Sequence, residues 1–236
     1  RGTIHCLMGE NGAGKSTLFN AICGSFLVDA GKIILDGEDI TFKSEHARAK
    51  EIGRVFQDPM KGTAPNMTIE ENLALAYTRS GKKRGPFSRA ITRKQTEFFR
   101  ENLARYNMGI EDRMKTKIGL LSGGQRQVVT LLMCTLSIPK LLLLDEHTAA
   151  LDPATAQKVM EITKEILESI LDAYSYEIVF VDRQHIVRYM NKTAKERYGE
   201  RVKINQSLFN CHSENSKVKI EEFLKRADAG EDEMFE

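Results

Sequence analysis

A glycine-rich stretch near the start of the sequence constrains the fold more than any other feature. Residues 9–17 read GENGAGKST and fit the pattern G-x-x-x-x-G-K-[S/T]. Glycines in such a loop let the backbone curl until successive N–H groups converge on phosphate oxygens. Lys15 adds a positive charge toward the β- and γ-phosphates, while Ser16 opens a helix and offers a hydroxyl to Mg²⁺. The segments on either side, residues 3–8 and 16–24, predict a strand, a loop and a helix.

This loop is expected to hold the phosphates of a nucleotide. An ordinary glycine-rich turn is disfavoured because the glycines, the Lys-Ser pair and the flanking elements all agree with the motif. A GTPase would add a base-reading N/TKxD motif, which this sequence lacks. The residues expected to contact the nucleotide here are Asn11, Gly12, Ala13, Gly14, Lys15, Ser16 and Thr17.

Predicted strands and helices alternate up to about residue 170, which is typical of an α/β sheet. Residues 140–148 read as an apolar strand ending in two acids, and we expect it to be a central parallel strand covered on both faces. A Thr-x-x-Glu capping box at Thr68 marks one helix start. The other expected strands and helices cover residues 31–40, 51–59, 68–79, 94–109, 122–138 and 153–171.

Composition excludes several classes of protein. The 41% hydrophobic content is ordinary for a globular chain, and the formal net charge of +2 does not argue for nucleic acid. The basic stretch 79–94 offers only Phe87 as an aromatic side chain, so we expect a solvated loop there. The four cysteines form no CxxC pair, which favours reduced thiols over a metal site. No apolar run is long enough to span a membrane.

An acid pair follows the leucine run 141–144. If this strand lies next to the one before the glycine-rich loop, Asp145 can hold the shell of a Mg²⁺ ion. Glu146 can then act as the general base that polarises an attacking water. Two strand-end acids on a solvated turn are the alternative, which the glycine-rich loop makes much weaker.

A second glycine motif, LSGGQ at residues 121–125, discriminates between kinds of nucleotide-binding protein. Ser122 and the two glycines open a helix and can present N–H groups to a second anion. A single nucleotide does not need two anion-binding loops that lie far apart in the sequence. Two copies packed head to tail do, because each helix start would face the γ-phosphate bound by the other copy. A simple Ser N-cap explains Ser122 but not the paired glycines.

Together these motifs resemble the nucleotide-binding domain of an ABC transporter, over about residues 2–165. The resemblance implies a P-loop NTPase core with a helical subdomain, ATP and Mg²⁺ as ligands, and Glu146 as catalytic base. Gln57 in VFQDP would be the Q-loop residue that reaches Mg²⁺ and the attacking water. The resemblance also implies that Ser16, Gln57 and Asp145 are the ligands of the metal ion. The signature residues Ser122, Gly123, Gly124 and Gln125, with Asp152 of the D-loop, would act across the dimer interface. His147 replaces the commoner proline after the acid pair.

The resemblance weakens at both ends of the motif set. The family implies two earlier strands with an adenine-stacking aromatic residue, and the sequence starts at what would be the third strand. It also implies a Ser/Thr-His pair directly after a late strand, whereas here His185 lies three residues too far. Three strand residues shift a side chain by about 10 Å and change its face, so His185 is expected to miss the γ-phosphate.

The tail, from residue 177 on, instead resembles the opening of a PAS sensor domain. The pattern is a strand, a turn with Asp182, a second strand, and a helix after Asn191. Asp182 is expected to bond turn N–H groups, and Asn191 to cap the helix. Ile186, Ala194 and Gly199 also match the pattern. A small PAS ligand is one expectation; haem or metal ligation by His212 is less favoured than an ordinary structural role.

We therefore expect an ABC-type ATP-binding domain over residues 1–166, lacking its first strands, and an incomplete α+β PAS-like segment over residues 167–236. The expected function is ATP hydrolysis by a homodimer or paired ABC subunit that powers a transmembrane permease, in the cytoplasm at the inner face of the plasma membrane. Alternatives are a PAS-type signalling protein that binds nucleotide without efficient turnover, or a soluble ABC protein of repair or translation. A fragment, a chimera and a misassembled gene all remain open as the origin of the chain.

Overall fold

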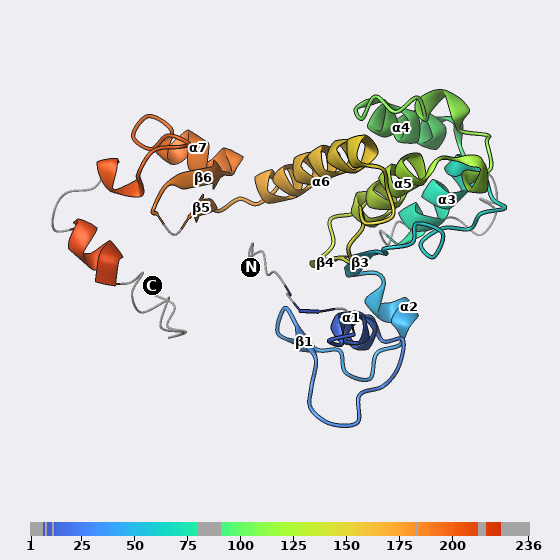
Figure 1. Ribbon diagram of the computed structural model, residues 1–236, viewed down its shortest axis with the longest axis horizontal. Coiled ribbons are helices and arrows are strands. Elements are labelled where there is room, and N and C mark those ends of the chain that lie inside the picture. The colour runs from blue at the N-terminus through green and yellow to red at the C-terminus, as the bar shows by residue number, and fades with distance from the viewer. Residues whose placement is uncertain are drawn as a thin grey trace. The chain divides into compact units, whose positions relative to one another are not determined.

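The computed structural model describes residues 7, 9–10, 12–79, 91–182, 184–211 and 216–222 (Figure 1). The chain divides into two compact units, with the division between Ile166 and Leu167. Most of the expected strand 3–8, Asn11, much of the basic stretch and His212 lie outside the described residues.

The first unit begins with the helix that follows the glycine-rich loop and a small hairpin. The strand and turn expected over residues 31–40 form a small hairpin: two short antiparallel strands flank the turn, where Asp36 and Gly37 both have positive φ. The elements are α1 (Lys15–Cys23), β1 (Ile34–Leu35), β2 (Glu38–Asp39) and α2 (Glu45–Arg48).

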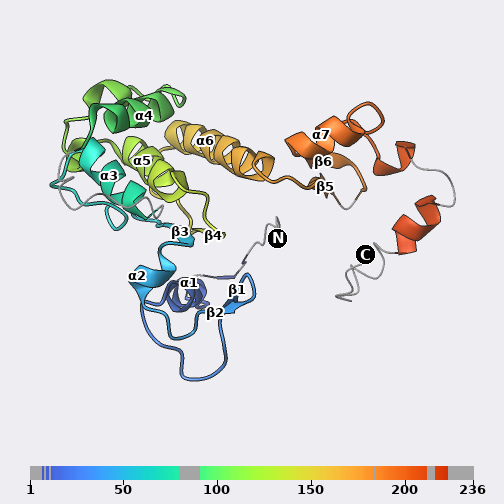
Figure 2. The same cartoon turned by 180° about the vertical axis from the view of Figure 1, so that it is seen from behind.

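A parallel strand pair connects the two candidate motif regions of this unit. β3 (Ile52–Val55) and β4 (Leu141–Leu144) pair in register, and they lie side by side in both views (Figures 1 and 2). Among the described strands, β4 pairs only with β3, and Leu143 is its one buried residue. The parallel pairing agrees with the expectation for this strand. A central place for β4 in the sheet stays a prediction, because most of the expected strand 3–8 lies outside the described residues.

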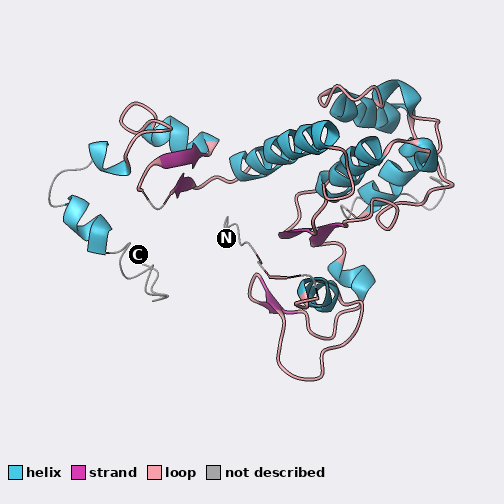
Figure 3. Ribbon diagram, viewed as in Figure 1, coloured by secondary structure: helices cyan, strands magenta, loops and turns pink. Residues whose placement is uncertain are grey.

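Helices make up the rest of the first unit (Figure 3). Three of them begin with a complete capping box, in which an N-cap hydroxyl and a Glu or Gln three residues later satisfy exposed N–H groups. The three are α3 (Ile69–Thr78), α4 (Arg93–Ala104) and α5 (Gly123–Thr135). The short 3₁₀ turns are η1 (Glu111–Arg113) and η2 (Ile118–Leu120).

These helices bury a common apolar core. Phe99 and Leu103 of α4, Leu73 of α3 and Leu131 of α5 are all fully buried. The expected end of α4 at Gly109 is wrong: the helix stops at Ala104, and Asn107 already has a φ of 49°. A left-handed backbone at that point cannot continue a helix.

The division between the units falls inside the long helix α6 (Pro153–Asp172). The second unit then forms a hairpin, a short helix and a 3₁₀ turn, while residues 216–222 are helical. Its named elements are β5 (Val179–Val181), β6 (Val187–Met190), α7 (Lys192–Tyr198) and η3 (Leu208–Cys211).

Two side chains organise this second unit as the sequence predicts. In the β5–β6 turn, Asp182 Oδ1 accepts from the N–H groups of Gln184 and Ile186. Those bonds, with Ile186 the strongest and Arg188 helping, hold the pKa of Asp182 below its usual range. His185 has a φ of 59° and its ring meets Phe209 edge-on, so it is a turn residue.

Asn191 is completely buried and uses its whole side-chain amide. Its Oδ1 accepts from the N–H groups of Ala194, as the expected cap of α7, and Ile178. Its Nδ2 donates to the carbonyl oxygens of Leu171 and Tyr176. The one side chain therefore connects the end of α6, the strand start and α7.

Replacing this residue is expected to destabilise the second unit. Asn191→Ala leaves two buried N–H groups and two carbonyls without their partners, which costs about 2–4 kcal/mol. Chemical denaturation followed by far-UV circular dichroism measures the change. The neighbouring exposed substitution Lys192→Ala is the control and is expected to cost less than about 0.5 kcal/mol. Equal effects of the two substitutions would contradict the assigned role.

Candidate nucleotide-binding site

The glycine-rich loop leads directly into α1. Gly12 and Gly14 have φ values of 87° and 88°, a backbone region that glycine enters without a steric penalty. Gly14 is the N-cap of α1 and provides no capping side chain. The first turn of α1 therefore has no side-chain acceptor at its cap, and the positive end of the helix is available to an anion.

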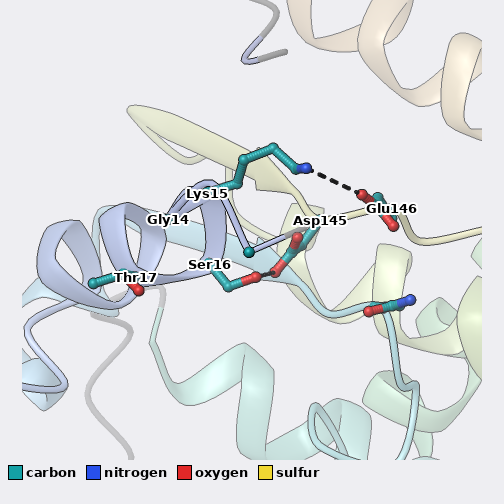
Figure 4. A pocket seen from close by; sticks show the side chains of 8 residues that line it. Gly14, Lys15, Ser16, Thr17, Asp145 and Glu146 are labelled. Atoms are coloured by element: carbon teal, nitrogen blue, oxygen red, sulfur yellow. Dashed lines mark hydrogen bonds and ion pairs between the residues drawn. The ribbon is translucent and has the colours of Figure 1, made fainter. Parts of the chain in front are cut away.

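Lys15 lies inside the curl of the loop. Its Nζ donates to the carbonyl oxygens of Gly9, at 2.6 Å, and Glu10, at 3.1 Å. The same Nζ lies 3.8 Å from Oε1 of Glu146, as the dashed line in Figure 4 marks. The Lys15 ammonium thus lies close both to the carbonyl oxygens of the loop and to Glu146, the second residue of the acid pair.

The β3–β4 register brings the acid pair to the loop. The Asp145 N–H donates to the Val55 carbonyl, continuing the parallel ladder one residue beyond β4. The Ser16 hydroxyl then lies 3.5 Å from Oδ2 of Asp145, and Figure 4 shows the two side chains pointing toward each other. A hydroxyl and a carboxylate converging from two elements are oxygen ligands of the type that Mg²⁺ takes.

One cavity of about 330 Å³ contains the predicted phosphate-contacting and acidic residues. Among the expected residues, Ala13 does not line it, and Asn11 lies outside the described residues. An adjoining cavity of about 370 Å³ shares Ser16, Gln57 and Asp145. The residues that line the first cavity are Gly12, Gly14, Lys15, Ser16, Thr17, Gln57, Asp145 and Glu146.

Glu146 has an unusual backbone. Its φ is 42°, and its side chain is 48% exposed, so the carboxylate is accessible from the cavity. A glutamate in the left-handed region costs about 1–2 kcal/mol. Such strain persists only where neighbouring structure imposes it, and it concentrates at functional sites.

The signature residues do not line this cavity. Ser122 is the N-cap of α5 and accepts from the Gln125 N–H, and the Gln125 amide donates to the Met108 carbonyl. A Cβ on Gly124 would come within 2.1 Å of Thr155 Cγ2. The close approach of α6 therefore leaves no room for a side chain at position 124, a packing constraint that sequence reasoning missed.

Asp152 is likewise engaged locally. Its Oδ1 accepts from the Thr155 N–H at 3.1 Å, at the start of α6. The Thr155 side chain and N–H hold the pKa of Asp152 below its usual range. Like the signature residues 122–125, Asp152 does not line the cavity beside the glycine-rich loop.

Sequence reasoning also missed two residues next to the acid pair. Arg54 donates from Nη2 to Oδ2 of Asp145 at 3.3 Å; the signal was a charge inside the apolar strand residues 52–56. His147, which stands where the family usually has proline, is buried, and its Nε2 lies 3.0 Å from the Thr163 hydroxyl. That hydroxyl donates to the Val159 carbonyl, so Nε2–H of His147 is the donor to it.

Comparison with known proteins agrees with this geometry. A family model described as ABC transporter matches residues 1–149. Two solved structures share 26% identity with the chain: a nucleotide-free ATP-binding cassette from an ABC transporter, with a TM-score of 0.53, and CbiO1 from Clostridium perfringens, part of the ABC transporter complex CbiONQ, with a TM-score of 0.51. They cover 68% and 82% of this chain, and 64% and 78% of their own chains. The chain belongs to the ABC transporter family, and its first unit has the P-loop NTPase fold of that family.

Curated relatives carry transport names. The chain is 43% identical over 166 residues to the tyrosine transport ATP-binding protein of Clostridioides difficile, covering 70% of this chain and 65% of that protein. It is 37% identical to the ribose import ATP-binding protein RbsA of Lactococcus lactis, covering 68% and 31%. It is 36% identical to the methionine import ATP-binding protein MetN of Vibrio vulnificus, covering 70% and 45%. The chain thus spans less than two thirds of the length of these relatives.

The contact of Gly124 with α6 predicts a compensating pair of substitutions. Gly124→Ala forces its new methyl group into Thr155 Cγ2 and is expected to destabilise the protein by about 1–3 kcal/mol. Thr155→Ser removes that atom, so the double variant is expected to recover most of the loss. Denaturation curves of both single variants and the double variant measure this coupling. Strictly additive effects would contradict it.

Burial of His147 predicts a pH-dependent stability. Desolvation lowers the pKa of this imidazole from its ordinary 6.5, so the unfolded chain binds a proton more readily than the folded one. The contribution of this group to the free energy of unfolding is complete above pH 6.5, and it falls as the pH drops below 6.5. We expect Tm to decrease by about 2–4 °C between neutral and mildly acidic pH because of this group.

The comparison variant for that measurement is His147→Gln, which keeps an amide donor for Thr163 but does not titrate. Its Tm is expected to fall less over the same range. If both proteins show the same slope, His147 is not the responsible group.

Proposed function

We propose that this chain binds ATP and hydrolyses it to power a transmembrane permease. The observation that carries the proposal is the convergence of four side chains on one cavity. Lys15 and Ser16 come from the start of α1, and Asp145 and Glu146 directly follow β4. Relatives named for the import of ribose and methionine support coupling to transport.

In this proposal each side chain has a separate task. The loop amides and Lys15 bind the β- and γ-phosphates. Ser16 and Asp145, with Gln57 in the same cavity, would hold Mg²⁺, which neutralises phosphate charge when bound. Few protein ligands suit this ion, since it keeps waters and phosphate oxygens in its shell.

Glu146 is proposed as the general base. Its carboxylate accepts a proton from the water that attacks the γ-phosphate, while Lys15 stabilises the phosphate charge. The Lys15 ammonium lies 3.8 Å from the Glu146 carboxylate, and phosphate oxygens that bind the ammonium would weaken this ion pair. That exchange would free the carboxylate to orient the water.

Some of the predicted site residues do not line the cavity, and these are the ones expected to act across a dimer interface. We propose that Ser122, Gly123, Gly124, Gln125 and Asp152 act at the site of a second ABC subunit, in a head-to-tail dimer. α5 is long enough for its start to present N–H groups to an anion. No described helix is long and apolar enough to cross a membrane. We infer a peripheral position on the cytoplasmic face of the plasma membrane through the permease.

The second unit is proposed to be a PAS-like segment, from the Asp182 turn and the Asn191 cap. A signalling protein that binds nucleotide without efficient turnover is the second candidate function. Purified full-length chain distinguishes the two: Mg²⁺-dependent phosphate release supports the ATPase. ATP binding without such release supports the signalling protein.

Removal of the general base tests the ATPase directly. Glu146→Gln keeps the size and hydrogen bonding of the side chain, so ATP binding is expected to persist. Phosphate release is expected to fall by about 10²–10⁴-fold, the usual contribution of general-base catalysis. Equilibrium dialysis with ATP and a phosphate-release assay measure the two quantities.

The matched control is Glu161→Gln on the exposed side of α6. It removes the same charge away from the cavity and is expected to leave turnover unchanged. Wild-type turnover in Glu146→Gln would defeat the assignment of the base.

A further inference from the structure

Arg54 is an arginine held rigidly within β3. Its side chain is only 10% exposed. Nη1 donates to Asn20 Oδ1 of α1 at 2.6 Å, and Nη2 to Asp145 Oδ2 at 3.3 Å. The guanidinium carbon lies 4.5 Å from the Phe56 ring centre and 5.9 Å from that of Phe19. Two hydrogen-bonded partners and two rings fix the orientation of the guanidinium plane.

The carboxylate oxygen that Arg54 contacts is also the one that Ser16 contacts. Asp145 Oδ2 lies 3.3 Å from the arginine and 3.5 Å from the serine hydroxyl. The Asp145 side chain is only 14% exposed, so water screens the arginine charge weakly. A metal ion bound by Ser16 and Asp145 would therefore coordinate a carboxylate that is already paired with the cationic side chain of Arg54.

Arg54 approaches this carboxylate from outside the nucleotide cavity. It is not among the residues that line that cavity. Instead it lines a separate cavity of about 210 Å³, together with Cys23 and Cys134. Arg54 therefore acts on the nucleotide site through Asp145 and not by lining the cavity, which makes it a positioning residue.

We propose that Arg54 holds the Asp145 carboxylate in place and lowers its affinity for Mg²⁺. The inference rests on the proposed function, since it assumes that Asp145 serves the metal bound with ATP. The fixed positive charge pairs with the carboxylate at 3.3 Å, and it repels a divalent cation nearby. The consequence is a site that takes up Mg²⁺ weakly unless phosphate oxygens contribute to the shell.

The test compares charge removal with charge retention at position 54. The full-length chain, Arg54→Met and Arg54→Lys are titrated with Mg²⁺ at fixed ATP, and bound ATP is measured by equilibrium dialysis. Arg54→Met is expected to reach half-maximal Mg²⁺-dependent binding at about three- to tenfold lower Mg²⁺. Arg54→Lys keeps the charge and is expected to stay close to wild type.

A second readout does not depend on turnover or on ATP quantification. Mn²⁺ in place of Mg²⁺ allows electron paramagnetic resonance to count the metal bound in the presence of ATP. The same order of affinities is expected, with Arg54→Met tightest. If thermal unfolding shows that Arg54→Met does not fold, Arg54→Gln removes the charge while keeping polar contacts, and the same expectation applies.

Three outcomes overturn the inference. An unchanged or higher Mg²⁺ requirement in the charge-free variant shows that the arginine does not weaken the metal site. An equal shift in Arg54→Lys shows that shape rather than charge is responsible. Absence of ATP binding by the wild-type chain overturns this inference and the proposed function together, whereas binding with an unaltered Mg²⁺ requirement overturns only the role of Arg54.

Discussion

The parallel pairing of β3 with β4 is the interaction on which the candidate site depends. Leu144 faces Val55 across the ladder, and the next N–H, that of Asp145, still bonds to Val55. A shift of one residue would move the acid pair to the other face and away from Ser16. The chemistry of the site is thus set by a backbone register, and the side chains that meet there come from segments far apart in sequence.

The parts of this site that could be predicted from sequence are those that local rules govern. The glycine-rich loop, the acids at a strand end and the capping box at Thr68 each depend on residues within a few positions of one another. The Asn191 cap is also local, and it was predicted correctly. The other three hydrogen bonds of its side chain were not, because Ile178, Leu171 and Tyr176 are brought to it only by the fold.

Long-range contacts account for what sequence reasoning missed. Arg54 and Asp145 are separated by 91 positions, and only the strand register makes them neighbours. The approach of Thr155 to Gly124 likewise depends on how α6 crosses the start of α5. The pairing of β4 with β3 is long-range as well: a run of leucines indicates burial, but it cannot tell which strand lies beside it.

The left-handed backbone of Glu146 sets a limit on how this protein can be improved. Glycine at that position would relax the main chain and raise the free energy of unfolding by about 1 kcal/mol, while deleting the carboxylate. Selection for thermal stability alone would therefore favour glycine at position 146, with loss of the carboxylate. With glutamate at this position, the fold tolerates a locally strained main chain and keeps a carboxylate at the cavity.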